Sequence, residues 1–155
     1  MYKDFQKHDT RNFQNQREDT EIRNVLTDIG QLTKLKDLDI KKFSDEKGYA
    51  DLLAIKLRGM KTGQLRKFFG EIKTIEKKLV GGENWKNVEI EFYQLKPRLA
   101  YAFGRKLIPE EFYNVVKIAL SKVDIGTDVE KKENFKMLVR FLEAIVAYHK
   151  FHNKD

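Results

Sequence analysis

Apolar residues recur at helical spacing along most of the chain, and this periodicity constrains the fold more than any other feature. The clearest stripe lies near the C-terminus, at positions i, i+3, i+4, i+7, i+10, i+11 and i+14, and comprises Phe135, Leu138, Val139, Leu142, Ile145, Val146 and His149. This period is that of one face of an α-helix. Phe141 and Tyr148 widen the stripe. A stripe this wide should bury against more than one neighbour, either inside a bundle or across a subunit contact.

Similar stripes predict the other helices. We expect helices over 20–29, from an N-cap at Ser44 to about Gly59, from a cap at Thr62 to Gly81–Gly82, from Asn84 to about 103, over 109–122, and from near Asp128 to the C-terminus. Pro97 should kink or split the fourth of these. Residues 30–43 are predicted to be a connection. Glycine (9) and proline (2) are scarce, which disfavours the many tight turns of a β fold. The predicted fold class is therefore all-α, a compact bundle of about five to six helices.

The domain organisation follows from where these stripes begin. Residues 1–20 are polar, their charges cancel, and their apolar residues set no period, so we expect a mobile polar tail. Residues 21–155 should form a single helical-bundle domain. Tyr2, Phe5 and Phe13 could stack on RNA bases, although such a composition is more often only a tail.

Composition excludes several classes of function. The chain has no cysteine, which rules out disulfides, thiolate metal sites and a cysteine nucleophile. It has neither a secretory h-region nor a long apolar run, so we expect a cytoplasmic protein with no membrane contact.

No catalytic site is evident. Ser44 and Ser121 lie outside any nucleophile-elbow sequence, and no glycine-rich phosphate loop occurs. His149 and His152 could offer two metal ligands, but no third ligand is visible nearby, so structural or terminal histidines are favoured. Glu143, beside the apolar face of the last helix, is a candidate for a buried hydrogen-bonding partner. We expect no catalytic activity, no metal and no cofactor.

The positive charge is concentrated in two stretches. The formal net charge is +7, and residues 61–80 and 96–107 each carry a net charge of +4, so the rest of the chain is nearly neutral. Such a concentration is typical of a surface that follows nucleic-acid phosphates, because neutralised phosphates release condensed counterions. A solvated lysine-rich face that aids solubility is an equally good explanation from charge alone.

Within the second stretch, Arg98, Tyr101 and Arg105 lie three and four residues apart and share one face of a helix. Two guanidinium groups beside a phenol suit phosphates and a ribose hydroxyl. The alternative is a tyrosine packed at a helix interface with both arginines in ion pairs.

Three segments together resemble the small subunit of the type III-A (Csm) CRISPR effector complex. They are TGQLRKFFGEIKTIE (62–76), LKPRLAYAFGR (95–105) and FLEAIVAYHK (141–150), and the resemblance extends over roughly residues 44–151. Phe103 stands where the family pattern has a small residue. The resemblance implies a non-catalytic helical bundle, present in several copies beside the subunits that hold the guide, that contacts the backbone of the guide–target duplex. Its implied partners are crRNA and target RNA, the other Csm subunits, and copies of itself.

The leading hypothesis is thus an RNA-binding scaffold subunit. Its expected contacts are Arg66, Lys67, Lys73, Arg98, Tyr101 and Arg105, with Lys61, Lys96 and Lys106 as secondary contacts. The alternative is a helical protein–protein interaction module in which the broad final helix carries the partner. A metal-dependent nuclease built on His149 and His152 is a third, weaker alternative.

Overall fold

The computed structural model describes the backbone of residues 2–153, and the side chains of Phe13 and of residues 16–153. Every regular element in this part of the chain is helical, which confirms the all-α prediction. The α-helices are α1 (Tyr2–Gln31), α2 (Ile40–Ser44), α3 (Tyr49–Lys56), α4 (Thr62–Val80), α5 (Trp85–Gly104), α6 (Glu110–Ser121) and α7 (Asp128–His152). A short 3-10 helix, η1 (Leu35–Asp37), lies between α1 and α2. Apart from the five-residue α2, the six longer α-helices match the predicted number.

Helix α7 lies at the centre of the bundle. It packs against α2, α3, α4, α5 and η1, and Phe135, Leu138, Phe141, Leu142 and Ile145 on it are fully buried or nearly so. Its N-terminus is fixed by a capping box, in which the Thr127 hydroxyl accepts a hydrogen bond from the Glu130 backbone N–H and the Glu130 carboxylate accepts one in return. The wide apolar stripe of the last helix is therefore buried inside the bundle, where it forms the core.

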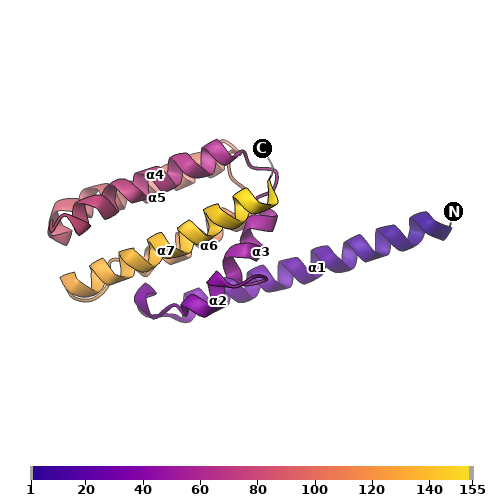
Figure 1. The fold of residues 1–155 in the computed structure, drawn as a ribbon, viewed down its shortest axis with the longest axis horizontal. Coiled ribbons are helices and arrows are strands. Elements are labelled where there is room, and N and C mark those ends of the chain that lie inside the picture. The colour runs from indigo at the N-terminus through magenta and orange to yellow at the C-terminus, as the bar shows by residue number, and fades with distance from the viewer. Residues whose placement is uncertain (1, 154–155) are drawn as a thin grey trace.

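Helices α4 and α5 form an antiparallel hairpin that lies side by side along one edge of the molecule (Figure 1). The turn between them begins with a Schellman motif, because the Glu83 N–H bonds the Lys78 carbonyl and the Gly82 N–H bonds the Leu79 carbonyl. Gly82 has φ +96°, which a residue without Cβ adopts at no steric cost. The predicted end of this helix at Gly81–Gly82 is confirmed.

Asp124, from the loop between α6 and α7, holds the N-terminal half of α5, which follows the hairpin turn. This carboxylate accepts hydrogen bonds from Trp85 Nε1, at 3.0 Å, and from the Tyr93 hydroxyl, and it pairs with Lys131 at 3.1 Å. Burial opposes ionisation of Asp124, but these donors outweigh it and lower its pKa below the usual value. The Trp85 ring is itself buried against Phe92 and Phe135.

Helix α1 is far longer than the predicted segment 20–29. Its C-terminal part packs on α6 and α3 through Ile22, Val25 and Ile29, whereas its N-terminal part projects away from the bundle (Figure 1). The Asp28 carboxylate accepts a hydrogen bond from Tyr49, and Lys56 pairs with Asp19 at 2.8 Å. The mobility of residues 1–20 stays a prediction, and the side chains of Tyr2 and Phe5 lie outside the described residues.

Some local predictions were wrong. Ser44 ends α2 and does not cap α3, which begins after Gly48. The predicted connection over 30–43 contains η1 and α2, and it buries Leu35, Leu38 and Phe43. Pro97 does not split α5, which is continuous from residue 85 to residue 104, whereas a kink at Pro97 stays a prediction. Glu143 is exposed. None of the helices in the described residues is long and apolar enough to cross a membrane.

One buried amide joins three parts of the bundle, and it yields a first prediction. The Asn134 side chain is fully buried, accepts a hydrogen bond from the Lys36 N–H at 2.8 Å, and donates to the Val123 and Ile125 carbonyls. Asn134→Ala removes the side-chain partner of the Lys36 N–H and of the Ile125 carbonyl, whereas the Val123 carbonyl keeps its hydrogen bond from the Ile125 N–H. The substitution should lower the free energy of unfolding by about 2–4 kcal/mol in urea titrations. Asn87→Ala, at an exposed position on α5, is the control and should change it by less than about 0.5 kcal/mol. Equal stabilities of the two variants would contradict the role of Asn134.

The capping box generates a pH prediction. A hydrogen bond from Lys34, followed by one from the Thr127 backbone, lowers the pKa of Glu130 from 4.5 to about 2. A carboxyl whose pKa is lowered on folding contributes stability above its unfolded pKa, and that contribution is lost as pH falls from 4.5 towards 2. The melting temperature of Glu130→Gln should therefore lie below that of the wild type at pH 7, with a difference that shrinks through this window. A difference that stays constant down to pH 2 would contradict this linkage; Glu133→Gln, at an exposed position, is the control.

Candidate nucleic-acid interface

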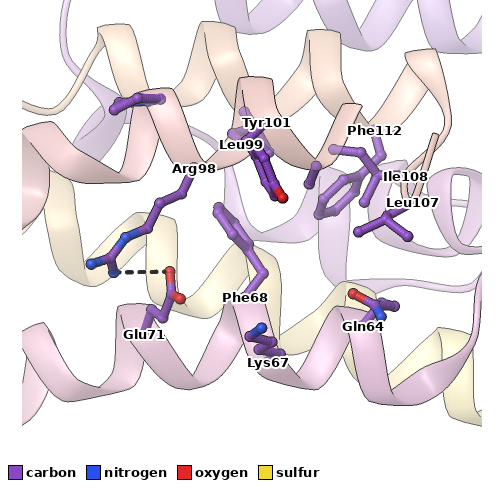
Figure 2. A pocket seen from close by; sticks show the side chains of 12 residues that line it. Gln64, Lys67, Phe68, Glu71, Arg98, Leu99, Tyr101, Leu107, Ile108 and Phe112 are labelled. Atoms are coloured by element: carbon purple, nitrogen blue, oxygen red, sulfur yellow. Dashed lines mark ion pairs between the residues drawn. The ribbon is translucent and has the colours of Figure 1, made fainter. Parts of the chain in front are cut away.

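A groove between α4 and α5 brings several of the predicted site residues together. It has a volume of about 400 Å³ and also reaches α6. We call it the α4–α5 groove; its lining is Gln64, Lys67, Phe68, Glu71, Pro97, Arg98, Leu99, Tyr101, Ala102, Leu107, Ile108 and Phe112. Figure 2 shows Arg98 and Tyr101 extending from α5 toward Phe68, Lys67 and Glu71 on α4. Residues from the two basic stretches therefore face each other across a single groove.

Helical phase explains why these side chains meet. On α5 the buried residues Leu95 and Leu99 set the inward direction, and Arg98 and Tyr101 fall on the flank that faces α4. Arg105, the C-cap residue of α5, contacts Tyr101. On α4 the buried residues Leu65 and Ile72 set the inward direction, and Lys67 and Glu71 fall on the flank that faces α5. The hairpin makes these two flanks adjacent.

The sequence left two alternatives for Arg98, Tyr101 and Arg105: an exposed phosphate-binding face, or a packed tyrosine with both arginines in ion pairs. The structure combines features of both. Tyr101 is 62% exposed, so it is not packed at a helix interface. Arg105 donates a hydrogen bond from Nη1 to the Tyr101 hydroxyl at 2.9 Å, and its guanidinium lies over the Tyr101 ring, 5.6 Å from the centroid. Arg98 instead pairs with Glu71, with 3.3 Å between Nη1 and Oε2. One arginine is thus held by an acid, whereas the other is held by the phenol.

The remaining predicted residues lie elsewhere. Arg66 and Lys73 are exposed on the outer flank of α4, the side away from α5, which they share with Lys77. Lys73 pairs with Glu76 at 2.6 Å, and this hydrogen bond raises the pKa of Lys73. Lys96 lines a hollow beside Lys117 and Tyr113 of α6. Lys61 is exposed at the start of α4.

Lys106 holds an unusual backbone conformation just beyond α5. Its φ is +60°, the left-handed region, and the Leu107 N–H bonds the Ala102 carbonyl to close a Schellman motif. A lysine there costs about 1 kcal/mol or more relative to glycine. The side chain lines a second hollow with Lys56, Met60 and Pro109, so it lies off the α4–α5 groove.

The groove is not uniformly basic. Glu71 lines it from α4 and pairs with Arg98. Glu91 of α5 pairs with Lys78 and lines an adjacent hollow between the two helices, together with Glu71 and Arg98. Counting charges along the sequence did not reveal Glu91, because it lies outside both basic stretches and approaches their residues only through the packing of the hairpin. The two histidines of α7 make contacts within the bundle. His149 is fully buried, and its Nε2 lies 3.1 Å from the Leu57 carbonyl and 3.0 Å from the Met60 carbonyl. His152 contacts the Asp51 carboxylate at 2.5 Å.

Residues 37–155 match the family model described as Csm2 Type III-A. The chain belongs to this family. It is therefore a small structural subunit of the type III-A CRISPR effector complex, the Csm complex, which confirms the resemblance inferred from the sequence. Neither the curated proteins nor the solved structures gave a match to the chain.

The segment that matches the Csm2 family covers all the α-helices of the bundle except α1. It begins in η1, after α1, and includes α2 through α7 together with every residue of the α4–α5 groove. Helix α1, with its projecting N-terminal part, lies outside the matched segment. The elements that build the groove therefore all lie within the matched segment.

The acidic residue of the groove, Glu71, yields a third prediction. Glu71→Gln removes the partner of Arg98, so a polyanion should bind more tightly, and the protein should elute from a heparin column at higher salt. Stability should change by less than about 1 kcal/mol, because the pair lies at the surface, with Arg98 exposed and Glu71 half-buried. Glu83→Gln is the matched control: it changes the net charge equally from an exposed position in the hairpin turn. Equal elution of the two variants would show that the local pair does not matter.

Proposed function

We propose that this chain is a non-catalytic, cytoplasmic, RNA-binding scaffold subunit that contacts the backbone of the crRNA–target RNA duplex within the Csm complex. Its neighbours are the guide-holding subunits and further copies of itself. The observation that carries the proposal is the α4–α5 groove, where Lys67, Arg98 and Tyr101 converge from two helices and Arg105 is held against Tyr101 at the edge. Membership in the Csm2 family gives the biological setting.

The chemistry of the groove suits a duplex whose bases are already paired. An A-form duplex hides its base edges in a deep groove and exposes phosphates and 2′-hydroxyls. Guanidinium groups bind phosphate oxygens in bidentate fashion, and a lysine ammonium adds a point charge. These contacts are independent of sequence, so base pairing between guide and target alone selects the target.

The principal contact surface is the α4–α5 groove, because cations from two helices lie there close to one another. Arg66 and Lys73 on the outer flank of α4 form a second surface, which a duplex bound at the groove reaches only by wrapping around α4. Lys61 and Lys106 lie at the ends of α4 and α5, Lys96 lies within α5 on the side towards α6, and all three contribute longer-range attraction.

The alternative function, a protein–protein interaction module, loses the surface on which it depended. It required the broad apolar face of the final helix to be available to a partner, but the core residues of α7 are buried within the bundle. Contacts with other Csm subunits must therefore use other surfaces.

A pair of charge-matched double variants tests the assignment. Lys67→Glu with Arg105→Glu alters the groove at Lys67 and at the Arg105 contact with Tyr101. Arg66→Glu with Lys77→Glu alters the outer flank of α4, and each pair changes the net charge by the same amount. The groove pair should weaken binding to a guide–target RNA duplex about tenfold more than the outer-flank pair, measured by fluorescence anisotropy at fixed salt. Melting temperatures and helicity should be unchanged, because all four side chains are exposed.

The salt dependence completes this test. The logarithm of the affinity should fall with the logarithm of the salt concentration by about 0.7–0.9 per phosphate contacted, and the groove pair should flatten that slope. Equal losses in both double variants would mean that only the net charge matters and would remove the assignment to the groove.

A further inference from the structure

The apolar floor of the α4–α5 groove has no role in contacting a duplex backbone. Phosphates need only the cations on the rim. The floor is nevertheless built from Phe68 of α4, Leu99 and Ala102 of α5, Ile108 from the loop, and Phe112 of α6. Its volume of about 400 Å³ lies within the range of small-molecule sites, about 300–1,000 Å³. It is therefore large enough for a flat ring system and too small for a docked helix.

Two aromatic rings face this space and are held in place. Phe68 packs edge-on against Phe112, with ring centroids 6.1 Å apart. Tyr101 is fixed by the hydrogen bond and the overlying guanidinium of Arg105. Figure 2 shows Phe68 and Tyr101 pointing into the groove from opposite helices, α4 and α5. Rigid, accessible aromatic rings are the surfaces on which unpaired nucleobases stack.

The rim offers hydrogen-bonding groups of both kinds. Glu71 accepts hydrogen bonds, Gln64 both donates and accepts, and Lys67 and Arg98 donate. The edge of a nucleobase also presents donors and acceptors together, and the phosphates on either side of it suit the two cations. An aliphatic anchor from a protein would use the floor but would make no hydrogen bonds with these polar groups.

We propose that the α4–α5 groove holds one unpaired nucleobase of the bound RNA, stacked on Tyr101 and Phe68, with its flanking phosphates on Lys67 and Arg98. This inference rests on the proposed function and deepens it, because the subunit then binds duplexes that contain an extruded nucleotide more tightly than continuous ones. The site does not select among bases by stacking, since every base has a π face.

The experiment compares two RNA duplexes that differ only by one unpaired 2-aminopurine, using the full-length protein. The duplex with the unpaired base should bind about fivefold or more tightly, the lower end of what stacking one base contributes. The fluorescence of the 2-aminopurine should be quenched when the protein binds. Tyr101→Leu removes the exposed ring, and Ala102→Phe fills the groove while leaving the cations in place. Both should abolish the preference and the quenching, whereas Phe151→Leu, which removes a ring 75% exposed on α7, should not.

The possible results separate this inference from the function on which it rests. Equal affinity for both duplexes, with no quenching, would overturn the nucleobase site and leave the duplex-binding function standing. Failure of the wild type to bind either duplex would overturn the proposed function itself. If Ala102→Phe left the fluorescence response intact but prevented assembly with the other Csm subunits, the groove would be a protein-docking site and the inference would be wrong.

Discussion

The burial of α7 is the interaction on which the rest of the structure depends. Its apolar face is too wide for one neighbour, so α2, α3, α4 and η1 all pack on it. This packing fixes the rotation of α4 about its own axis, because Leu65, Ile72 and Ile75 must point into the core. Once that rotation is set, Lys67 and Glu71 necessarily face α5, and Arg66 and Lys73 necessarily lie on the outer flank. The arrangement of surface charge is thus a consequence of core packing.

The hairpin places the oriented flank of α4 against α5, and the two helices together form the site. Gly82 reverses the chain in a few residues, and Asp124 fixes the turn end of the hairpin through Trp85 and Tyr93. The flanks of α4 and α5 then meet along their length, with cations from each helix on the rim and apolar side chains on the floor. Acids meet there as well, and the pair between Arg98 and Glu71 moderates the field that a bound polyanion would experience. The groove is therefore a mixed polar surface over an apolar base, which phosphate attraction alone does not require.

Most of the fold could be predicted because helical periodicity is a local property. The inward residues of α6 and α7, such as Phe112, Val116, Leu138 and Leu142, are buried as their spacing indicated. The failures arose where local signals conflict with packing. Ser44 has the chemistry of an N-cap but ends α2, and η1 and α2 are too short to show a period, although Leu35 and Phe43 belong to the core. Helix α1 extends back to Tyr2 through a segment without an apolar stripe.

The sequence by itself determined the all-α class, the faces of the long helices, the concentration of charge in two stretches and, through three specific segments, the family. The tertiary structure alone decided which basic residues share a surface. Arg66 and Lys67 are neighbours in sequence, yet they lie on different flanks of α4, whereas Lys67 and Arg98 are far apart in sequence and line the same groove. A helix turns by about 100° per residue, so adjacent positions separate, and only the packing of α4 against α5 brings distant positions together.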